Sequence, residues 1–320
     1  MTPQPPPDPL AGDDEYRHTP DPDVELWNES WYLDAVADEG RVGAYLRYSL
    51  YPNEGMAWVW ACVVGEDRDL VATVEHELPL PTDAASLDLD TRAARLRQSI
   101  PEPFGEVTVD LEADALRLAR PDDLYDGVGG TPARVRLALT WSPLAGPYRY
   151  PGMTRYEVAC TVAGRIEVDD EVIEIEGDGE RDHSWGHRDW WAFPWMWTWG
   201  RLDDGTYLHA TRPDIPGIEY EPGFALAPDG DLVEVSGFTP SHERDAAGLV
   251  TGTEARLHGL SLRITPLHAS PLRLEAPDGR VTRLERALCR FEELGGAGRT
   301  GYGWSEWNQP RVGDGGISRR

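Results

Sequence analysis

Residues 177–199, G-D-G-E-R-D-H-S-W-G-H-R-D-W-W-A-F-P-W-M-W-T-W, contain six of the thirteen tryptophans of the chain. If this stretch is a strand, alternate side chains point to opposite faces. One face then carries His183, Trp185, His187, Asp189 and Trp191, and the other carries Asp182, Ser184, Arg188 and Trp190, with Gly186 as a bend. Titratable groups set among indole rings suit proton chemistry on an apolar molecule.

The composition limits the partners that the protein can have. The 320 residues are enough for two domains, and the formal net charge is -27 with a pI near 4.5. This charge argues against binding to nucleic acid or to anionic membranes, because phosphate groups would be repelled. Solubility alone is the simpler explanation of the charge.

No targeting or membrane segment is recognisable in the sequence. The N-terminus lacks the basic and apolar regions of a signal peptide, and no apolar run approaches the roughly eighteen residues of a membrane helix. Cys62, Cys160 and Cys289 are far apart and indicate buried free thiols in a reducing compartment. We therefore expect a soluble cytoplasmic protein without a membrane span, and a homodimer is compatible with the sequence.

The pattern along the chain predicts an all-β protein. About fifteen short segments alternate or are rich in β-forming residues, among them 42–51, 56–64 and 133–141, and turn residues separate them. The pattern of residues 91–100 is compatible with a short helix or with a loop. We expect two antiparallel β-barrels in tandem, with a pocket in or between them, since barrels of about eight strands can hold one small ligand.

Composition also suggests where the domains begin and end. Residues 1–22 are rich in Pro and Asp and are predicted to be disordered. The Pro- and Gly-rich segment 142–153 predicts a boundary, with one β domain over 23–145 and a second, carrying the D-H-S-W-G motif, over 146–310. Residues 311–320 are predicted to be a tail.

The motif Gly-x-Gly-x-x-Asp-His-x-Trp-Gly at 177–186 resembles the tandem-lipocalin superfamily. That superfamily includes carotenoid hydratases such as hydroxyneurosporene synthase, AttH-like proteins and fungal Diels–Alderase-like cyclases. W-N-E-S-W-Y at 27–32, R-D-H-S-W-G-x-R-D-W at 181–190 and G-Y-G-W-S-E at 301–306 extend the resemblance over residues 24–308, most closely to a bacterial branch. The resemblance implies two lipocalin-like barrels.

The resemblance also implies site residues. The His and Trp of the motif lie near the catalytic pocket of the carotenoid hydratases, which carries over to His183 and Trp185. The acid of those enzymes is an aspartate in a Tyr-x-Asp context on a following strand. Here Tyr207-Leu208-His209 stands at that place and Asp214 is the nearest aspartate, so another group must supply the proton.

We expect the catalytic groups to be Asp182, His183, Asp189 and His209. An apolar pocket would raise the pKa of an aspartate acid, while His209 would serve as a second base. The predicted substrate-binding residues are aromatic: Trp31, Trp185, Trp190, Trp195, Trp197, Trp199 and Tyr207. Glu29, Trp31 and Glu306 are expected at a second edge of the pocket.

Structural roles remain open for the same residues. The tryptophans 195, 197 and 199 could fill a core, and His183 and His187 could be buried histidines bonded to backbone carbonyls. Asp182 could pair with Arg181 or Arg188, and a pair of Arg188 with Asp189 could join the two halves.

The sequence also contains side chains that could form a metal site. His183, His187, His209 and Asp189 are the ligand types of a zinc or iron site. On one strand, however, His183 and His187 would lie about 13 Å apart unless Gly186 breaks it. We therefore expect no metal and no cofactor.

Two classes of function follow. In the first, a cofactor-independent acid–base enzyme (a lyase, isomerase or cyclase) acts on a terpenoid, steroid or polyketide-like molecule. It would hydrate, dehydrate, isomerise or cyclise its substrate through a cation held over indole faces. In the second, a lipocalin-like protein binds a small lipophilic molecule without turnover.

Overall fold

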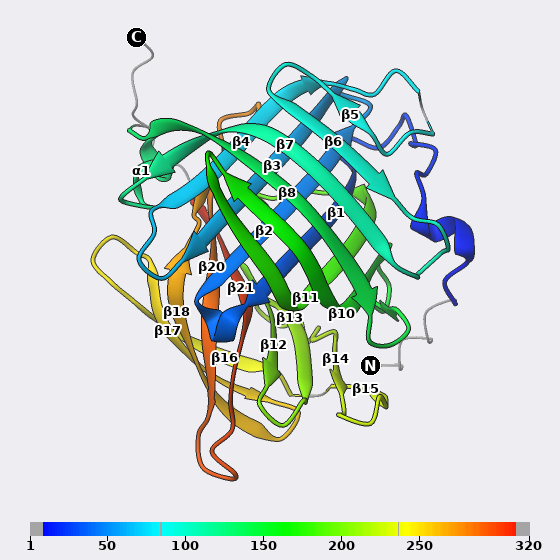
Figure 1. Cartoon of the computed structure of the whole chain (residues 1–320). Coiled ribbons are helices and arrows are strands. Elements are labelled where there is room, and N and C mark those ends of the chain that lie inside the picture. The colour runs from blue at the N-terminus through cyan, green and yellow to red at the C-terminus, as the bar shows by residue number, and fades with distance from the viewer. Residues whose placement is uncertain (1–8, 84, 128, 236, 312–320) are drawn as a thin grey trace.

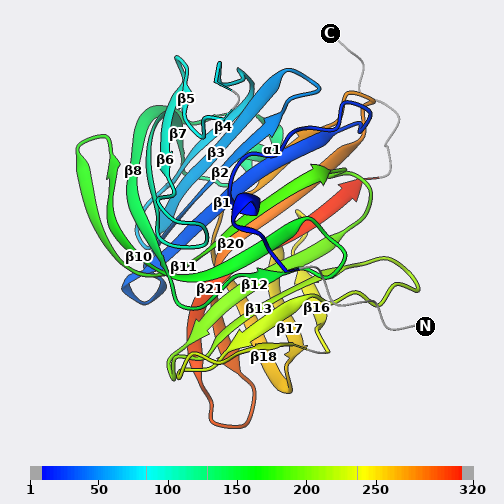
Figure 2. The same cartoon turned by 90° about the vertical axis from the view of Figure 1, so that its right-hand side faces the viewer.

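The computed structural model describes residues 9–83, 85–127, 129–235 and 237–311, which form two antiparallel β-sheets (Figures 1 and 2). The first sheet consists of β1 (Trp27–Ala37), β2 (Val42–Tyr51), β3 (Met56–Gly65), β4 (Leu70–Pro79), β5 (Leu89–Asp90), β6 (Ala94–Ser99), β7 (Val107–Leu118), β8 (Thr131–Pro143), β9 (Tyr148–Arg149), β10 (Arg155–Val168) and β11 (Glu171–His187). The second consists of β12 (Trp195–Leu202), β13 (Tyr207–Pro213), β14 (Gly223–Leu226), β15 (Leu232–Glu234), β16 (Thr239–Arg244), β17 (Val250–Leu257), β18 (Leu260–Ala269), β19 (Leu272–Glu275), β20 (Val281–Glu293) and β21 (Thr300–Arg311).

The helical segments that the structure describes are short: η1 (Gly12–Glu15), η2 (Asp38–Gly40) and α1 (Asp123–Asp126). No helix in the described ranges is both long and apolar enough to cross a membrane. The prediction of an all-β protein is confirmed. Residues 91–100, assigned from sequence to a helix or a loop, instead contain strand β6.

The first sheet closes into a barrel and the second stays open. Strand β4 pairs with β7, which closes a ring of eight strands, β1–β4 with β7, β8, β10 and β11. The second sheet runs in the order β15-β14-β13-β12-β21-β20-β18-β17-β16. Its end strands do not pair with each other within the described residues. The tandem therefore consists of a closed barrel and an open, barrel-like sheet.

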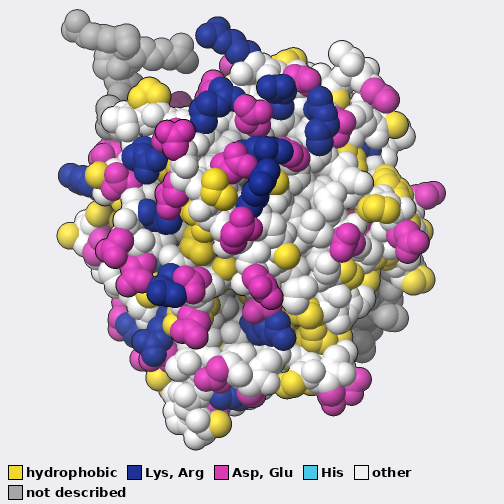
Figure 3. Space-filling view, viewed as in Figure 1, with side chains coloured by type: hydrophobic (Ala, Val, Ile, Leu, Met, Phe, Trp, Pro, Cys, Tyr) yellow, Lys and Arg dark blue, Asp and Glu magenta, His cyan; other side chains and the backbone are white. Residues whose placement is uncertain are grey.

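Alternation along the strands explains the interior of the barrel. In β7, Val107, Val109 and Leu111 are buried in the barrel core, while the alternating residues Asp110 and Glu112 point outward. The outward acids pair with arginines of β8, such as Arg136 with Asp110. Acidic and arginine side chains are accordingly intermixed on the face of the molecule in Figure 3. This is the pattern of a sheet with one face in a core and one in water.

Where the second sheet covers the barrel, the strands are buried on both faces. Every residue of β1 is buried. Trp31 and Leu33 point into the barrel core, whereas Tyr32 and Val36 belong to the core between the two sheets, together with Trp199 of β12. The far face of the second sheet covers a third core, which includes Leu262 and Phe291.

The glycines of the central motif permit close contact between β1 and β11. A Cβ at Gly177 would lie 2.0 Å from the carbonyl oxygen of Val36, and one at Gly179 would lie 2.1 Å from that of Asp34. No side chain fits such distances. The Gly-x-Gly part of the motif therefore serves the packing of the backbone.

The predicted boundary at 142–153 does not coincide with the change of sheet. Strands β10 and β11, which follow that segment, belong to the first sheet, and the chain enters the second sheet between His187 and Trp195. The D-H-S-W-G motif thus lies in the barrel and not in the second sheet. The Pro- and Gly-rich segment is the connection from β8 to β10, because turn-forming residues mark any loop, whether or not a domain ends there.

The prediction of disorder for residues 1–22 is wrong for residues 9–22, while residues 1–8 lie outside the described part. Leu10 packs against the barrel core, and Glu15 is fully buried. Glu15 accepts hydrogen bonds from Arg181 Nη1 at 2.7 Å and from the backbone N–H of Phe104 at 2.7 Å. Long-range ion pairs of this kind leave no signal in local composition. The predicted tail 311–320 lies outside the described residues except for Arg311, which ends β21.

Replacing Glu15 with Ala should lower the free energy of unfolding by about 3–5 kcal/mol, because Arg181 would be left buried without its partner. Urea denaturation followed by tryptophan fluorescence measures the change. Glu275→Ala, which removes the exposed Arg273–Glu275 pair, should cost less than about 1 kcal/mol. Equal effects of the two substitutions would contradict the anchoring role of Glu15.

Candidate active site

Strand β11 separates the motif into two environments. Arg181 and His183 point toward the barrel core, where His183 stacks on Trp31 with ring centroids 4.6 Å apart. Asp182, on the other face, points toward the second sheet and lines a pocket. The strand ends at His187, just after Gly186 with φ of +101°. The bend at Gly186 is present, and Asp182 and His183 point to opposite faces as predicted. Trp185, His187 and Asp189, which were predicted to share the face of His183, instead line the pocket with Asp182, because the strand bends and ends there.

The pocket between the two sheets has a volume of about 920 Å³, within the range of small-molecule sites. Residues of both sheets and of the 188–194 connection form its walls. Its polar residues include five arginines and three acids: Arg47, Arg149, Arg155, Arg188, Arg286, Asp182, Asp189 and Glu306. Its aromatic residues are Tyr32, Tyr150, Trp185, Trp190, Phe193, Trp195, Trp197 and Tyr220.

Asp182 is the acidic group best placed for chemistry in this pocket. The residue is 3 % exposed, and its Oδ2 accepts a hydrogen bond from Arg155 Nη2 at 2.8 Å. Its Oδ1 is buried without a hydrogen-bond partner among the described residues. Only one of the two carboxylate oxygens is thus held by a hydrogen bond. The sequence-based alternatives, pairs with Arg181 or Arg188, are not formed.

Asp189 lines the pocket but is engaged in a structural pair. Its carboxylate accepts hydrogen bonds from Arg280 Nη1 at 2.8 and 3.1 Å and from the backbone N–H of Trp191. The predicted pair with Arg188 is therefore wrong. Arg188 donates instead to Ser184 Oγ at 2.8 Å.

The predicted aromatic residues divide into two groups. Trp185, Trp190, Trp195 and Trp197 line the pocket. Trp31, Trp199 and Tyr207 do not line it, because each is buried in a core. Of the expected second edge, Glu306 lines the pocket and pairs with Arg286, whereas Glu29 lies on the barrel side with Trp31.

His209 lies behind the wall of the pocket and not in it. The residue is fully buried, and its Nε2 is 2.7 Å from the hydroxyl of Tyr150, which is also 2.7 Å from Thr211 Oγ1. Tyr150 and Thr211 both line the pocket. Burial lowers the pKa of His209 to about 4, so its neutral ring can accept the Tyr150 proton. His209 therefore acts on the pocket only through Tyr150.

Behind His209 lies a group of buried carboxyls. Glu180 Oε1 is 2.7 Å from His209 Nδ1, although the two are not aligned as a hydrogen bond. Burial raises the pKa of Glu180, and burial also raises the pKa of Glu157 to about 8 despite the opposing charge of Arg155. Glu157 is thus mainly protonated at neutral pH.

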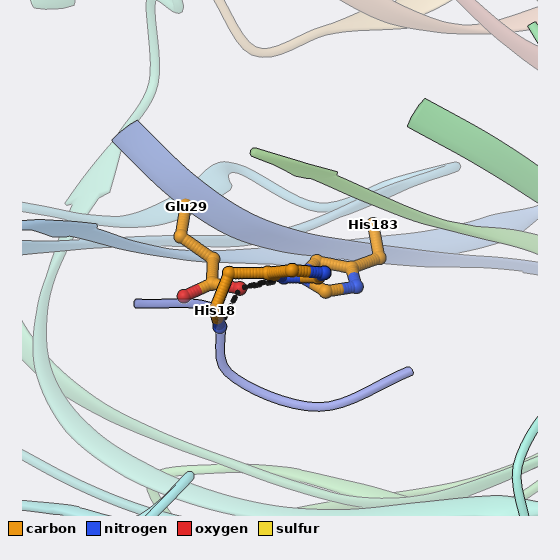
Figure 4. A group of neighbouring side chains, drawn as sticks. All are labelled: His18, Glu29 and His183. Atoms are coloured by element: carbon orange, nitrogen blue, oxygen red, sulfur yellow. Dashed lines mark hydrogen bonds and ion pairs between the residues drawn. The ribbon is translucent and has the colours of Figure 1, made fainter. Parts of the chain in front are cut away.

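His183 belongs to a separate group with His18 and Glu29 (Figure 4). Its Nε2 is 3.2 Å and His18 Nδ1 is 2.8 Å from the same oxygen, Glu29 Oε1. His183 Nδ1 is 2.9 Å from the carbonyl oxygen of Asp14. Burial by itself would lower the pKa of His18, but the hydrogen bond to Glu29 outweighs burial and raises it. The group ties the N-terminal segment to β1 and β11.

Two sets of side chains have the ligand types and spacing to hold a metal ion. In each, the ligand atoms lie within 4.8 Å of one another: His18, Glu29 and His183 in one, and Glu157, Glu180 and His209 in the other. The set weighed from sequence is not brought together, because His183 and His209 fall into different groups. His187 Nδ1 lies instead 2.8 Å from the carbonyl oxygen of Glu25.

Sequence reasoning missed the arginines of the pocket and Tyr150. Arg47 offers the clearest signal, since a lone charge stands within the otherwise apolar and polar-neutral run Y-L-R-Y-S-L-Y of β2. A charge there must meet a polar partner or a pocket. Arg155 and Arg286 carry no comparable signal, because each stands in a mixed run.

The two antiparallel sheets have the fold of tandem lipocalin-like β domains, which the sequence resemblance implied. The chain belongs to the family described as "Domain of unknown function (DUF7064)", whose profile matches residues 11–311. No curated protein matches the sequence.

Solved structures share the fold at low sequence identity. An AttH-like protein from Nitrosomonas europaea superposes with a TM-score of 0.59 at 16 % identity, covering 88 % of this chain and 92 % of that one. Kievitone hydratase from Nectria haematococca gives 0.60 at 12 % identity, covering 88 % of each chain. CghA gives 0.54 at 12 % identity, covering 91 % of this chain and 90 % of that one. Likeness at this identity shows the fold alone.

The buried carboxyl of Glu157 predicts a pH dependence of stability. The folded protein holds a proton on this group up to about pH 8, whereas the unfolded chain releases it near the ordinary pKa of 4.5. The stabilisation that comes from protonated Glu157 is fully present below pH 4.5 and is lost as the pH rises through 8. The Glu157→Gln side chain cannot release a proton. Its free energy of unfolding should therefore rise relative to that of the wild type by up to about 1 kcal/mol per pH unit between pH 5 and 8.

Urea denaturation of both proteins at several pH values in this range measures the difference. Glu275→Gln, a change at an exposed carboxylate, should follow the wild type throughout. Parallel curves for Glu157→Gln and wild type would contradict a protonated Glu157.

Proposed function

We propose that the protein is a cofactor-independent acid–base enzyme that moves a proton to or from carbon in a lipophilic molecule. Hydration, dehydration, isomerisation and cyclisation all belong to this class. The observation that carries the proposal is the unpartnered Oδ1 of Asp182, buried in the wall of a tryptophan-lined pocket. The structural likeness to kievitone hydratase, a hydratase by its name, is consistent with it.

The residues of this chain supply both directions of proton transfer. Asp182 Oδ1 takes a proton from a C–H bond or from a water molecule, while Arg155 holds the other oxygen. The Tyr150 hydroxyl supplies a proton at the opposite step when the Nε2–H tautomer of His209 donates to the Tyr150 oxygen, which leaves the phenol hydrogen free for the pocket. Arg155 also lies over the Tyr150 ring, at 5.2 Å, so one guanidinium contacts both groups.

The charge of the pocket bears on the reaction course. The sequence suggested a cation held over indole faces. Guanidiniums already occupy such positions: Arg47 lies 4.8 Å and Arg188 lies 5.4 Å from the centre of the Trp190 ring. A further cation would be repelled by them, whereas a developing oxyanion would be stabilised. We therefore favour proton abstraction next to a carbonyl, through an enolate, over protonation of an isolated alkene.

Turnover in D₂O tests the proposal, because a proton returned to carbon from solvent leaves a retained deuteron, while hydration or dehydration changes the mass of the compound by one water. A panel of terpenoid, steroid and polyketide carbonyl compounds is incubated with the protein, and mass spectrometry measures both changes. Asp182→Asn should reduce the rate about 10²- to 10⁴-fold while binding, followed by tryptophan fluorescence, persists.

Asp178→Asn is the matched control. Asp178 is on the same strand and also pairs with an arginine, Arg201, but it does not line the pocket. This variant should incorporate deuterium at the wild-type rate. Binding of the panel by the wild type without either change in mass, or an unchanged rate in Asp182→Asn, would favour a carrier of lipophilic molecules.

A further inference from the structure

The pocket carries an excess of arginine in a strongly acidic chain. The sequence contains 30 basic residues, all arginine, and 57 acidic residues. The pocket reverses this ratio, with five arginines against three acids in its walls. A random selection of residues from this chain would contain more acids than arginines. The excess of arginine in the pocket therefore calls for a local explanation.

Three of the five arginines have carboxylate partners. The pairs are Arg149 with Asp14 at 3.7 Å, Arg155 with Asp182 at 2.8 Å and with Glu157 at 2.7 Å, and Arg286 with Glu306. Arg47 and Arg188 form no ion pair with any residue that the structure describes. Both line the pocket, and Arg47 is 3 % exposed.

Neutral groups hold these two guanidiniums in place. Arg47 donates to Ser49 Oγ at 3.1 Å and to Ser30 Oγ at 2.5 Å. Arg188 donates to Ser184 Oγ, which is 3.1 Å from Ser30 Oγ across the β1–β11 ladder. Both guanidiniums also contact Trp190. One serine pair and one indole therefore fix two like charges side by side without neutralising either.

Holding these like charges close together is unfavourable in free energy. Burial, with the neighbouring charges of Arg155 and Arg47, lowers the pKa of Arg188 to about 10. Burial also lowers the pKa of Arg47. Around the pocket wall, four guanidiniums (Arg47, Arg155, Arg188 and Arg286) thus face the carboxylates of Asp182 and Glu306. A bound anion would relieve the repulsion.

We propose that the substrate is an amphipathic carboxylate whose acidic group lies between Arg47 and Arg188. Its apolar skeleton would lie against Trp185, Trp195 and Trp197. Guanidiniums match the planar carboxylate through paired N–H donors. The inference rests on the proposed function in that it assigns a chemical group of the substrate to the same pocket.

A pair of probes that differ only in charge tests this. cis-Parinaric acid and its methyl ester share one skeleton, and energy transfer from the pocket tryptophans reports binding of either. The wild type should bind the acid at least tenfold more tightly than the ester. Arg47→Gln and Arg188→Gln should each weaken binding of the acid at least tenfold and change binding of the ester less than twofold.

Arg273→Gln is the control, because Arg273 and its exposed partner Glu275 are both outside the pocket. It should leave both affinities unchanged. Arg188 is only partly buried and lies beside the pocket, so its variant is expected to fold even if Arg47→Gln does not. Circular dichroism verifies folding. Equal binding of acid and ester by the wild type, no binding of either, or a preference that survives in Arg188→Gln would overturn the inference.

The two proposals fail in different ways. Because the probe experiment measures binding alone, a preference for the acid stands even if no compound takes up deuterium. Conversely, turnover of neutral compounds without a preference for the acid would overturn the carboxylate site and leave the acid–base function intact.

Discussion

The structure depends on the burial of β1 and of residues 179–184 of β11 on both faces, which the packing of the second sheet against the closed barrel brings about. Apolar side chains on one face fill the barrel, and those on the other fill the layer between the sheets. Asp34 shows how tightly the layers are joined. Its carboxyl accepts hydrogen bonds from Trp199 Nε1 and the backbone N–H of Glu180, each at 2.8 Å, and burial raises its pKa.

Burial on both faces determines the surroundings of the charged side chains in the pocket. Polar side chains on the outer face of the barrel point into water, where arginines and acids are intermixed (Figure 3). On the covered face they point into a layer with little water, so each charge needs a specific partner. Asp182 and Glu306 have such partners in Arg155 and Arg286. Arg47 and Arg188 lack them beside an open volume, and this imbalance marks the site more clearly than any single motif residue.

Much of the fold could be predicted from local pattern. Strand β2 begins and ends at the predicted residues 42 and 51, because its β-forming residues lie between clear turn signals. Strand β6 was missed although A-R-L-R-Q-S alternates between buried and exposed positions. Residues 1–22 were predicted to be disordered from their Pro- and Asp-rich composition, whereas Glu15 and His18 bind residues 166 and 11 positions away. Local composition gives no signal of a contact such as that between Glu15 and Arg181, which are far apart in the sequence.

The sequence by itself determined that the chain is all-β, that its central motif bends at Gly186, and that Asp182 and His183 point to opposite faces, since these follow from a period of two. Only the tertiary structure decided which face meets the pocket. It placed Asp182, Trp185, Trp190, Trp195 and Trp197 there and put His183, His209, Trp199, Tyr207 and Trp31 in cores. The physical reason is that a strand's alternation assigns side chains to faces, whereas the nature of each face depends on which sheet, core or cavity packs against it.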